Sequence, residues 1–259
     1  MGKNRLSSQN IKSLFSLKNE FPDYYRYHGR KISKSLSKKN INLILEYYHL
    51  HSLDKIIINY HQSENIKKKL SFSMDRYKKI NIEIGFGDGE FLLKNAISNP
   101  SELFIGSEFY VNGIAKVLKK ILELKLNNLK LINLNCLYLL QSIKSQSVDR
   151  IYIINPDPWK KKKHHKRRLI SPENINLFYK IIKTKGSIYL TTDSNDYIQS
   201  IQKIFKNNSK IFSFPEIGLL SKNDELFGIS RYQRKAIKNG GNIYLVRMWN
   251  NSIFLHLIY

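Results

Sequence analysis

From residue 80 onward, short apolar runs alternate with amphipathic segments. The apolar runs predict strands over residues 80–84, 102–107, 129–134, 148–154, 187–192, 211–214 and 243–248. Apolar residues at helical spacing predict helices over residues 90–98, 112–126, 136–144, 172–183 and 195–205. Strands that alternate with helices indicate a doubly wound α/β fold with a mostly parallel sheet.

The ends of these elements carry weaker signals. Ser171 followed by Pro172 predicts an N-cap and first position for the helix over 172–183. Residues 216–241 are mostly polar and predict a long loop or lid between the two late strands. Before residue 80 the periodicity is weak, and it predicts only a short helix over 40–50 and a short strand over 55–60.

The first part of the chain is polar and basic. We therefore divide the chain into a basic N-terminal arm, residues 1–50, and a folded domain, residues 51–259. The segment RYHGR, residues 26–30, places two arginines and two aromatic-type rings beside a glycine. It is typical of a solvated tail, or of an arm that folds on RNA with arginine on phosphate and rings on bases.

Charge indicates the class of partner. The 259 residues include 44 Lys and Arg against 20 Asp and Glu, a formal charge of +24, which favours a polyanion such as nucleic acid. The chain is also rich in Ile and Asn, so part of the lysine content reflects general composition. A single cysteine, Cys136, excludes disulfide frameworks and cysteine-based zinc sites and suits a reducing cytoplasm. We expect no bound metal, no membrane span and no secretion signal.

The segment GFGDG, residues 85–89, predicts a glycine turn between the first strand and its helix. A dinucleotide fingerprint has glycine at its first, third and sixth positions, whereas here Glu90 takes the sixth. An acid at a helix start, with Glu83 nearby, would repel a pyrophosphate. The turn therefore suits a cationic cofactor such as S-adenosylmethionine, unless it is only a structural turn.

Polar residues follow the second and third strands. Glu108 stands where an acid receives the ribose diol in nucleotide-binding folds. Asn135, next to Cys136, stands where an adenine edge would lie, and its amide both donates and accepts. Capping of the following helix explains Asn135 equally well.

The segment NPDPW, residues 155–159, ends the most apolar strand. Nine residues follow, 160–168, of which seven are Lys or Arg. Ligands of open parallel sheets bind at the carboxyl ends of strands, so Asp157 and Trp159 predict an acidic, aromatic pocket there. Asp193 ends the neighbouring strand and would converge with Asp157, or would cap the next helix. The basic run predicts phosphate binding; a solvated loop or a localisation signal are the alternatives.

In this order, the segments IEIGFGDGEFL, GSEFY, INPDPWKKKKHHKRRLI, TTD and SRYQRKA resemble the bacterial tRNA (guanine-N7)-methyltransferases. The resemblance runs from about residue 27 to residue 246, and the PDPW segment with its basic run is its most specific part. It implies a Rossmann-like class I methyltransferase sheet of seven strands with the last strand antiparallel. It also implies S-adenosylmethionine as donor, tRNA as substrate and guanine 46 of the variable loop as target.

The resemblance also implies roles for individual residues. Asp157 would be the catalytic residue, and the donor site would be formed by Glu83, Gly85, Gly87, Glu108, Asn135 and Asp157. The substrate would be bound by Lys161, Asp193, Ser230, Arg231 and Gln233. Two positions depart from the family, which commonly has Asp where Asn135 stands and Glu where Gln233 stands. The protein would act as a monomer or a homodimer.

The chemistry of the target suits these residues. Guanine N7 attacks through an in-plane lone pair without losing a proton, so the reaction needs no strong general base. Carboxylates such as Asp157 and Asp193 would stabilise the growing positive charge on the base. Three alternatives stay open: a methyltransferase for an exocyclic base amine, a nucleotide-dependent oxidoreductase, and an RNA-binding protein that has lost catalysis.

Overall fold

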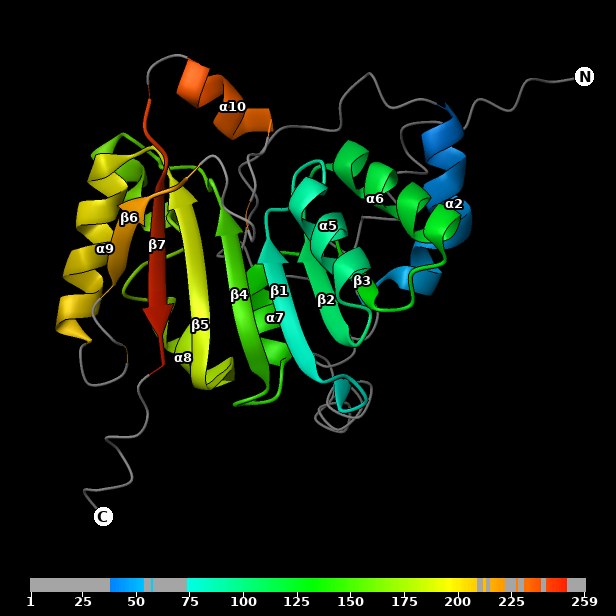
Figure 1. Ribbon diagram of the computed structural model, residues 1–259, viewed down its shortest axis with the longest axis horizontal. Helices are drawn as coiled ribbons and strands as arrows, with labels where there is room; N and C mark the ends of the chain where they lie inside the picture. The colour runs from blue at the N-terminus through cyan, green and yellow to red at the C-terminus, as the bar shows by residue number, and fades with distance from the viewer. Residues whose placement is uncertain are drawn as a thin grey trace, which may run out of the picture.

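A seven-stranded sheet forms the centre of the computed structural model, which describes residues 38–53, 57, 74–208, 212, 215–221, 227, 231–238 and 241–250 (Figure 1). The strands are β1 Lys79–Ile84, β2 Glu102–Ser107, β3 Leu129–Ile132, β4 Val148–Ile154, β5 Ile182–Thr192, β6 Glu216–Leu219 and β7 Tyr244–Trp249. Their order is β3-β2-β1-β4-β5-β7-β6. Strands β1 to β5 are parallel and β7 is antiparallel to both of its neighbours, which confirms the predicted sheet.

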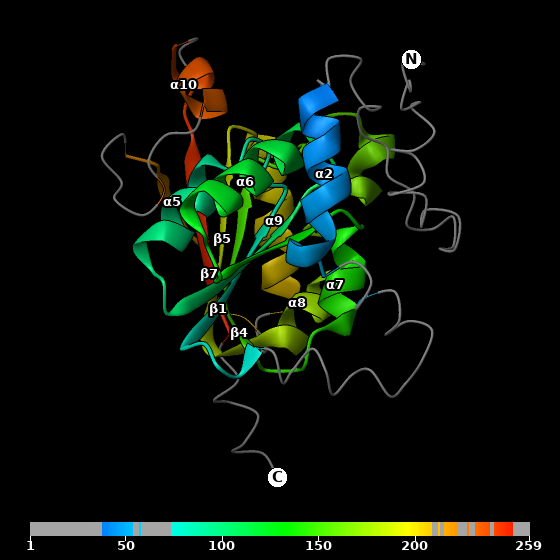
Figure 2. The same ribbon diagram turned by 90° about the vertical axis from the view of Figure 1, so that its right-hand side faces the viewer.

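Helices cover both faces of this sheet. They are α2 Lys38–His51, α5 Glu90–Ser98, α6 Val111–Leu124, α7 Cys136–Ser142, α8 Ile175–Ile181, α9 Asn195–Asn207 and α10 Arg231–Lys238, with a 3-10 helix, η4, at Lys162–Arg167. Helices α5 and α6 lie on one face, and α7, α8 and α9 lie on the other (Figures 1 and 2). Helix α2 lies in the segment assigned to the arm except for its last residue, His51, and packs against α6 and the edge strand β3.

Alternation along β1 positions its side chains for this layered core. Ile80, Ile82 and Ile84 are buried in the cluster that includes α7, α8 and α9. Asn81 and Glu83 therefore point to the opposite face, beneath α5 and α6. The strand order reverses between β1 and β4, and a ligand crevice forms at such a switch point.

Several predicted elements differ from the observed ones. The helix predicted from Pro172 begins at Ile175, because residues 172–174 form a turn in which the Ser171 carbonyl accepts from Asn174 and Ile175. Strand β5 begins at Ile182 instead of residue 187, because Ile182 already pairs with Val148.

The predicted long loop over residues 216–241 is also wrong. It contains strand β6, in which Ile217 pairs with Val246, and helix α10. Of the strand predicted over 211–214, Phe212 forms an isolated antiparallel bridge to Asn250 and its neighbours lie outside the described residues. Of the strand predicted over 55–60, only Ile57 is described, and it is helical, so the prediction is wrong at that residue. The RYHGR segment lies outside the described residues. Within the described part of the chain, no helix has the length and apolarity needed to cross a membrane.

Candidate active site

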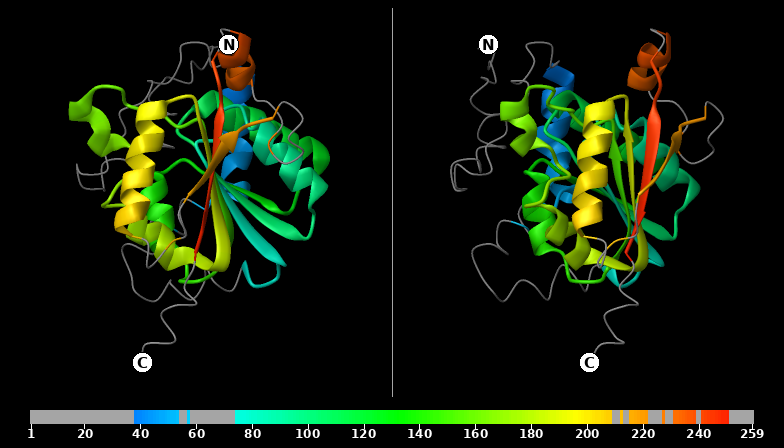
Figure 3. Two further views of the ribbon diagram at one scale, coloured as in Figure 1. Left: turned by 60° about the vertical axis from the view of Figure 1, so that its left-hand side comes forward. Right: turned by 90° about the vertical axis from the view of Figure 1, so that its left-hand side faces the viewer.

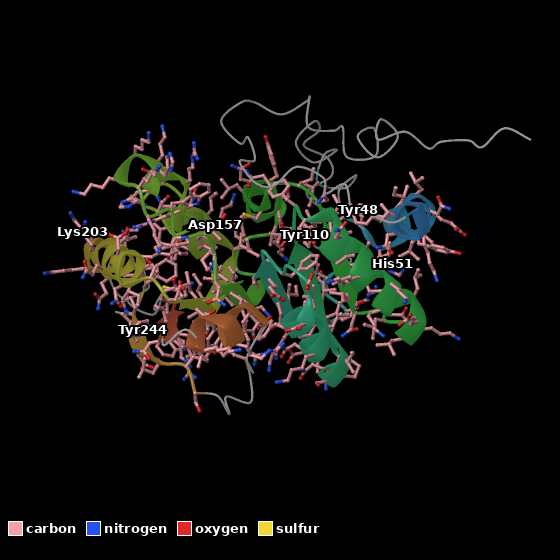
Figure 4. The ribbon with its side chains drawn as sticks, turned by 90° about the horizontal axis from the view of Figure 1, so that it is seen from above. Tyr48, His51, Tyr110, Asp157, Lys203 and Tyr244 are labelled. Carbon is pink, nitrogen blue, oxygen red and sulfur yellow. The ribbon has the colours of Figure 1, made fainter. Side chains whose placement is uncertain are left out.

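A cavity of about 340 Å³ opens at the carboxyl ends of β1, β2 and β4. This volume falls within the range of roughly 300 to 1,000 Å³ that small-molecule sites occupy. Figure 4 looks onto this edge of the sheet and shows Asp157 and Tyr110 near its centre. The cavity is lined by Ile84, Gly85, Ser107, Glu108, Phe109, Cys136, Ile154, Asn155, Pro156, Asp157 and Leu169.

The glycine turn follows β1 directly. Gly85, Gly87 and Gly89 have φ angles of 76°, 54° and 77°, a left-handed conformation that glycine adopts without a steric cost. A Cβ atom on Gly113, in α6, would overlap the carbonyl oxygen of Gly87. The turn therefore lies directly against the helix, while a Cβ on Gly85 would meet no atom within 4 Å. A ligand can approach the backbone at Gly85.

The Glu108 carboxylate holds this turn in place. Its Oε2 accepts a hydrogen bond from the Gly87 N–H at 2.7 Å. Its Oε1 accepts from the N–H groups of Phe109 at 2.6 Å and Tyr110 at 2.8 Å. Oε2 has a further lone pair, so Glu108 can also receive a hydroxyl group from a ligand in the cavity.

Glu83 is a buried acid beneath the cavity. It directly precedes the lining residues Ile84 and Gly85, and its side chain is only 3% exposed. Burial, with a smaller effect of the Glu108 charge, raises the pKa of Glu83 from 4.5 to about 8. Its Oε2 atom has no hydrogen-bond partner among the described residues. A buried carboxylate without a partner is unfavourable, and a cationic ligand group would stabilise its charged form.

Asp157 lies in a turn that begins and ends with left-handed residues. Asn155 has a φ of 49° and Trp159 a φ of 46°, and neither is glycine. The Asn155 N–H donates to the Thr191 carbonyl at 3.0 Å, and the Thr191 hydroxyl donates to Asn155 Oδ1 at 3.1 Å. Gln233, from α10, donates in turn to Thr191 Oγ1 at 3.3 Å. These contacts from β5 and α10 stabilise a backbone that would otherwise be strained.

The basic run forms the rim next to this turn. Lys161 is exposed, and its carbonyl accepts from the His164 N–H at 2.7 Å at the start of η4. The Arg167 guanidinium lies over the Trp159 ring at 5.0 Å, and the His164 ring meets the same indole edge-on at 5.8 Å. The run is thus partly helical and is packed on Trp159.

The structure places the other predicted residues as follows. Asp193 is exposed at the end of β5, and the N-cap of α9 is Ser194, so the capping alternative for Asp193 is wrong. Asn135 caps α7 by accepting from the Leu137 N–H at 3.0 Å, while the adjacent Cys136 lines the cavity. Ser230 lies outside the described residues.

Two further predicted residues belong to α10. Arg231 begins this helix, and Gln233 is 1% exposed and faces β5. On the same helix, Arg234 approaches Glu90 at 3.6 Å, next to the glycine turn. Helix α10 therefore connects the end of β5 with the start of α5.

Sequence reasoning did not single out Thr191, Arg168 or the lining residues Ser107, Phe109 and Leu169. A local signal existed for Thr191, since the segment TTD places polar residues at the end of an apolar strand. No such signal marked Arg168, because its position in a basic run resembles that of its exposed neighbours.

Comparisons with known proteins agree with this arrangement. A family model described as "Putative methyltransferase" matches residues 77–246. A tRNA (guanine-N(7)-)-methyltransferase of Wolbachia pipientis wMel is 33% identical over 190 residues, which cover 72% of this chain and 81% of that protein. A bifunctional methyltransferase of Rickettsia felis is 35% identical over 213 residues, covering 82% of this chain and 37% of that protein.

The solved structures show the same fold. The structure of an antibiotic-related methyltransferase superposes with a TM-score of 0.55 at 15% identity, covering 71% of this chain and 94% of that one. The chain spans little more than a third of the Rickettsia felis relative, but most of the Wolbachia relative. On these matches, the chain belongs to the tRNA (guanine-N7)-methyltransferase family.

Proposed function

We propose that this protein transfers a methyl group from S-adenosylmethionine to N7 of guanine 46 in the variable loop of tRNA. The observation that carries the proposal is the acidic character of the cavity at the switch point. Glu108 and Asp157 line it and the unpaired Glu83 lies beneath it, which suits a donor with two cationic groups and no phosphate. Family membership independently supports the same reaction.

The residues around the cavity fit this donor, which supplies a methyl group activated by a sulfonium. Glu83 would pair with the ammonium group of the donor, and Glu108 would receive a ribose hydroxyl. Gly85 and Gly87 have no side chains, which leaves space for the donor to approach the backbone of the glycine turn. Asn135 stands next to Cys136, which lines the cavity, and would contact the adenine there.

Asp157 is the catalytic residue of this proposal. Its turn holds the carboxylate at the cavity while its own side chain is exposed, so it can reach both donor and base. Methylated N7 leaves the guanine cationic, and Asp157 together with Asp193 would stabilise that charge as it develops. Alignment and charge stabilisation thus replace proton abstraction.

The basic rim accounts for the substrate class. Lys161 and the other lysines of residues 160–163 are exposed, so their ammonium groups can reach phosphates from solvent. Asp193, Ser230 and Arg231 would form the rest of the tRNA site, and the buried Gln233 would support it through Thr191. We place the reaction in the cytoplasm, with the protein as a monomer or homodimer. The division into an arm, 1–50, and a methyltransferase domain, 51–259, is part of the same proposal.

Incubation with radiolabelled S-adenosylmethionine and unmodified bulk tRNA, followed by nucleoside analysis, tests the proposal. We expect the label in 7-methylguanosine. Label in an N-methylated exocyclic amine would instead identify the alternative methyltransferase. No label in any nucleoside, from protein shown to be folded, would favour an RNA-binding protein that has lost catalysis.

A further inference from the structure

Arg168 differs from the rest of the basic run in its burial. The eight residues before it, 160–167, are all exposed or half-buried. The Arg168 side chain is 2% exposed, and it is among the largest fully buried side chains of the described residues. A guanidinium at this depth cannot contact a tRNA phosphate in solvent, so the basic run contains two kinds of cation.

The contacts of Arg168 join two separate parts of the site. Its Nε donates to the Pro158 carbonyl at 2.9 Å. Its Nη2 pairs with Oδ2 of Asp196, and the guanidinium lies 5.0 Å from the centre of the Tyr197 ring. Pro158 belongs to the Asp157 turn, whereas Asp196 and Tyr197 belong to the first turn of α9. In Figure 3 the yellow-green η4 lies beside the upper end of the yellow α9.

The contacts of Arg168 with Pro158 and Asp196, called the Arg168 bridge below, connect the segments that carry Asp157 and Asp193. These are the two carboxylates to which we assign charge stabilisation. Pro158 directly follows Asp157, and Asp196 stands three residues after Asp193. A second contact closes the same junction, because the Ile170 N–H donates to the Tyr197 hydroxyl at 3.0 Å. The Asp157 turn ends at Trp159 in a left-handed conformation, so a bond to the Pro158 carbonyl acts where the backbone needs support.

We propose that Arg168 is a positioning residue that sets Asp157 relative to Asp193 and does not bind tRNA phosphate. The roles of Asp157 and Asp193 in the reaction rest on the function proposed above. The contacts of Arg168 that connect their segments do not depend on that function. Arginine is required for its planar fork, which bonds a carbonyl and a carboxylate while stacking on a ring. The exposed cations of the run, such as Lys166, carry the phosphate contacts.

Arg168→Met and the matched control Lys166→Met separate these roles. We expect Arg168→Met to lower kcat about 100-fold, the order of loss that a misplacement of about 1 Å causes. Its KM for tRNA and the dependence of tRNA binding on salt should stay within twofold of wild type. Lys166→Met should raise the KM and lower the salt slope by roughly one phosphate contact. A reduced salt slope in Arg168→Met, or an unchanged kcat, would overturn the proposal.

Two additional measurements keep the test decisive. If Arg168→Met fails to fold, Asp196→Asn serves instead, because the Asp196 side chain is 60% exposed and tolerates replacement. We expect Asp196→Asn to lower kcat about tenfold, which corresponds to one charged hydrogen bond, and an unchanged kcat would overturn the proposal.

Binding of S-adenosylhomocysteine, measured by calorimetry, needs no methyl transfer. It should weaken at least about tenfold in Arg168→Met because Asp157 lines the cavity. Lys166→Met should bind this ligand as wild type does. If the wild type binds S-adenosylhomocysteine but forms no 7-methylguanosine, the proposed function fails, and the binding data still decide the role of Arg168. Equal binding by wild type and Arg168→Met would contradict the positioning role of Arg168.

Discussion

Gln233 on α10 donates a hydrogen bond to Thr191 Oγ1 at the end of β5, across 3.3 Å. Thr191 in turn donates to Asn155 Oδ1, at the start of the Asp157 turn. A helix late in the chain is thereby connected to the Asp157 turn through one buried hydroxyl. The family resemblance assigns Gln233 to substrate binding, and the structure shows that Gln233 also makes a structural contact.

Replacing Gln233 with Leu should weaken catalysis by loosening this connection. The change removes one hydrogen bond and leaves an acceptor position of Thr191 empty, a net loss of about 1 kcal/mol. We expect kcat/KM to fall about fivefold and the thermal midpoint to drop. Lys238→Ala, at an exposed position of the same helix, should keep the wild-type midpoint. Equal midpoints for all three proteins would show that the Gln233 contact does not hold α10.

Much of the sheet and its helices could be predicted from the sequence. The observed bounds of α5, β2 and β4 coincide with the predicted ones, because glycine, proline and asparagine interrupt strong apolar patterns there. Helix α10 could not be predicted. Its segment is polar, and the burial of Gln233 depends on Thr191, 42 residues earlier in the chain.

The candidate site, too, was predictable from the sequence only in part. The glycine turn, Glu108 and Asp157 follow strand ends, so the alternation of elements was enough to bring them together. The role of Arg168 depends on Asp196, 28 residues later, which the pattern of a basic run does not reveal. The helix-capping role of Asn135 was one of two open interpretations, and only the hydrogen bond to Leu137 establishes it.

Gly113→Ala should displace the glycine turn. The new Cβ would overlap the Gly87 carbonyl oxygen, and the backbone fixes the positions of both atoms, so no side-chain rotation can separate them. We expect S-adenosylhomocysteine to bind at least about tenfold more weakly, with a stability loss of about 1 to 3 kcal/mol typical of overpacking. Calorimetry and chemical unfolding would measure the two effects. Unchanged affinity would mean that the Gly87 turn is not part of the donor site.

Glu83 should make the stability of the free protein depend on pH. Its pKa is about 8 in the folded protein, against 4.5 ordinarily, so between these values the folded state holds a proton that the unfolded state lacks. The unfolding free energy should therefore decrease as pH rises from about 4.5 to 8, by at most about 1.4 kcal/mol per unit. Glu83→Gln should flatten this slope in chemical unfolding, and an identical slope in both proteins would contradict the buried acid.

The same carboxyl predicts a proton released on ligand binding. Pairing with the ammonium of S-adenosylhomocysteine favours the charged form of Glu83, so its pKa falls and a proton leaves near pH 7. Calorimetry in buffers with different ionisation enthalpies would detect this release in the wild type and not in Glu83→Gln. An equal release from both proteins would assign the proton to another group.

Asp157→Asn should reduce turnover and leave tRNA binding nearly intact. The amide keeps the shape of the side chain but removes the negative charge to which we assign stabilisation of the methylated base. We expect kcat to fall about 100-fold, by analogy with the loss of one preorganised charge-stabilising group. The KM for tRNA should change less than twofold in steady-state assays. Turnover equal to that of the wild type would exclude Asp157 as the catalytic residue.

The most direct measurement uses two tRNA transcripts that differ at one atom. One carries guanine at position 46 and the other carries 7-deazaguanine, in which a C–H group replaces N7. With radiolabelled S-adenosylmethionine, we expect label in the guanine transcript and none above background in its 7-deaza partner. Equal labelling of both would show that the methyl group goes to another atom and would contradict N7 of guanine 46 as the target.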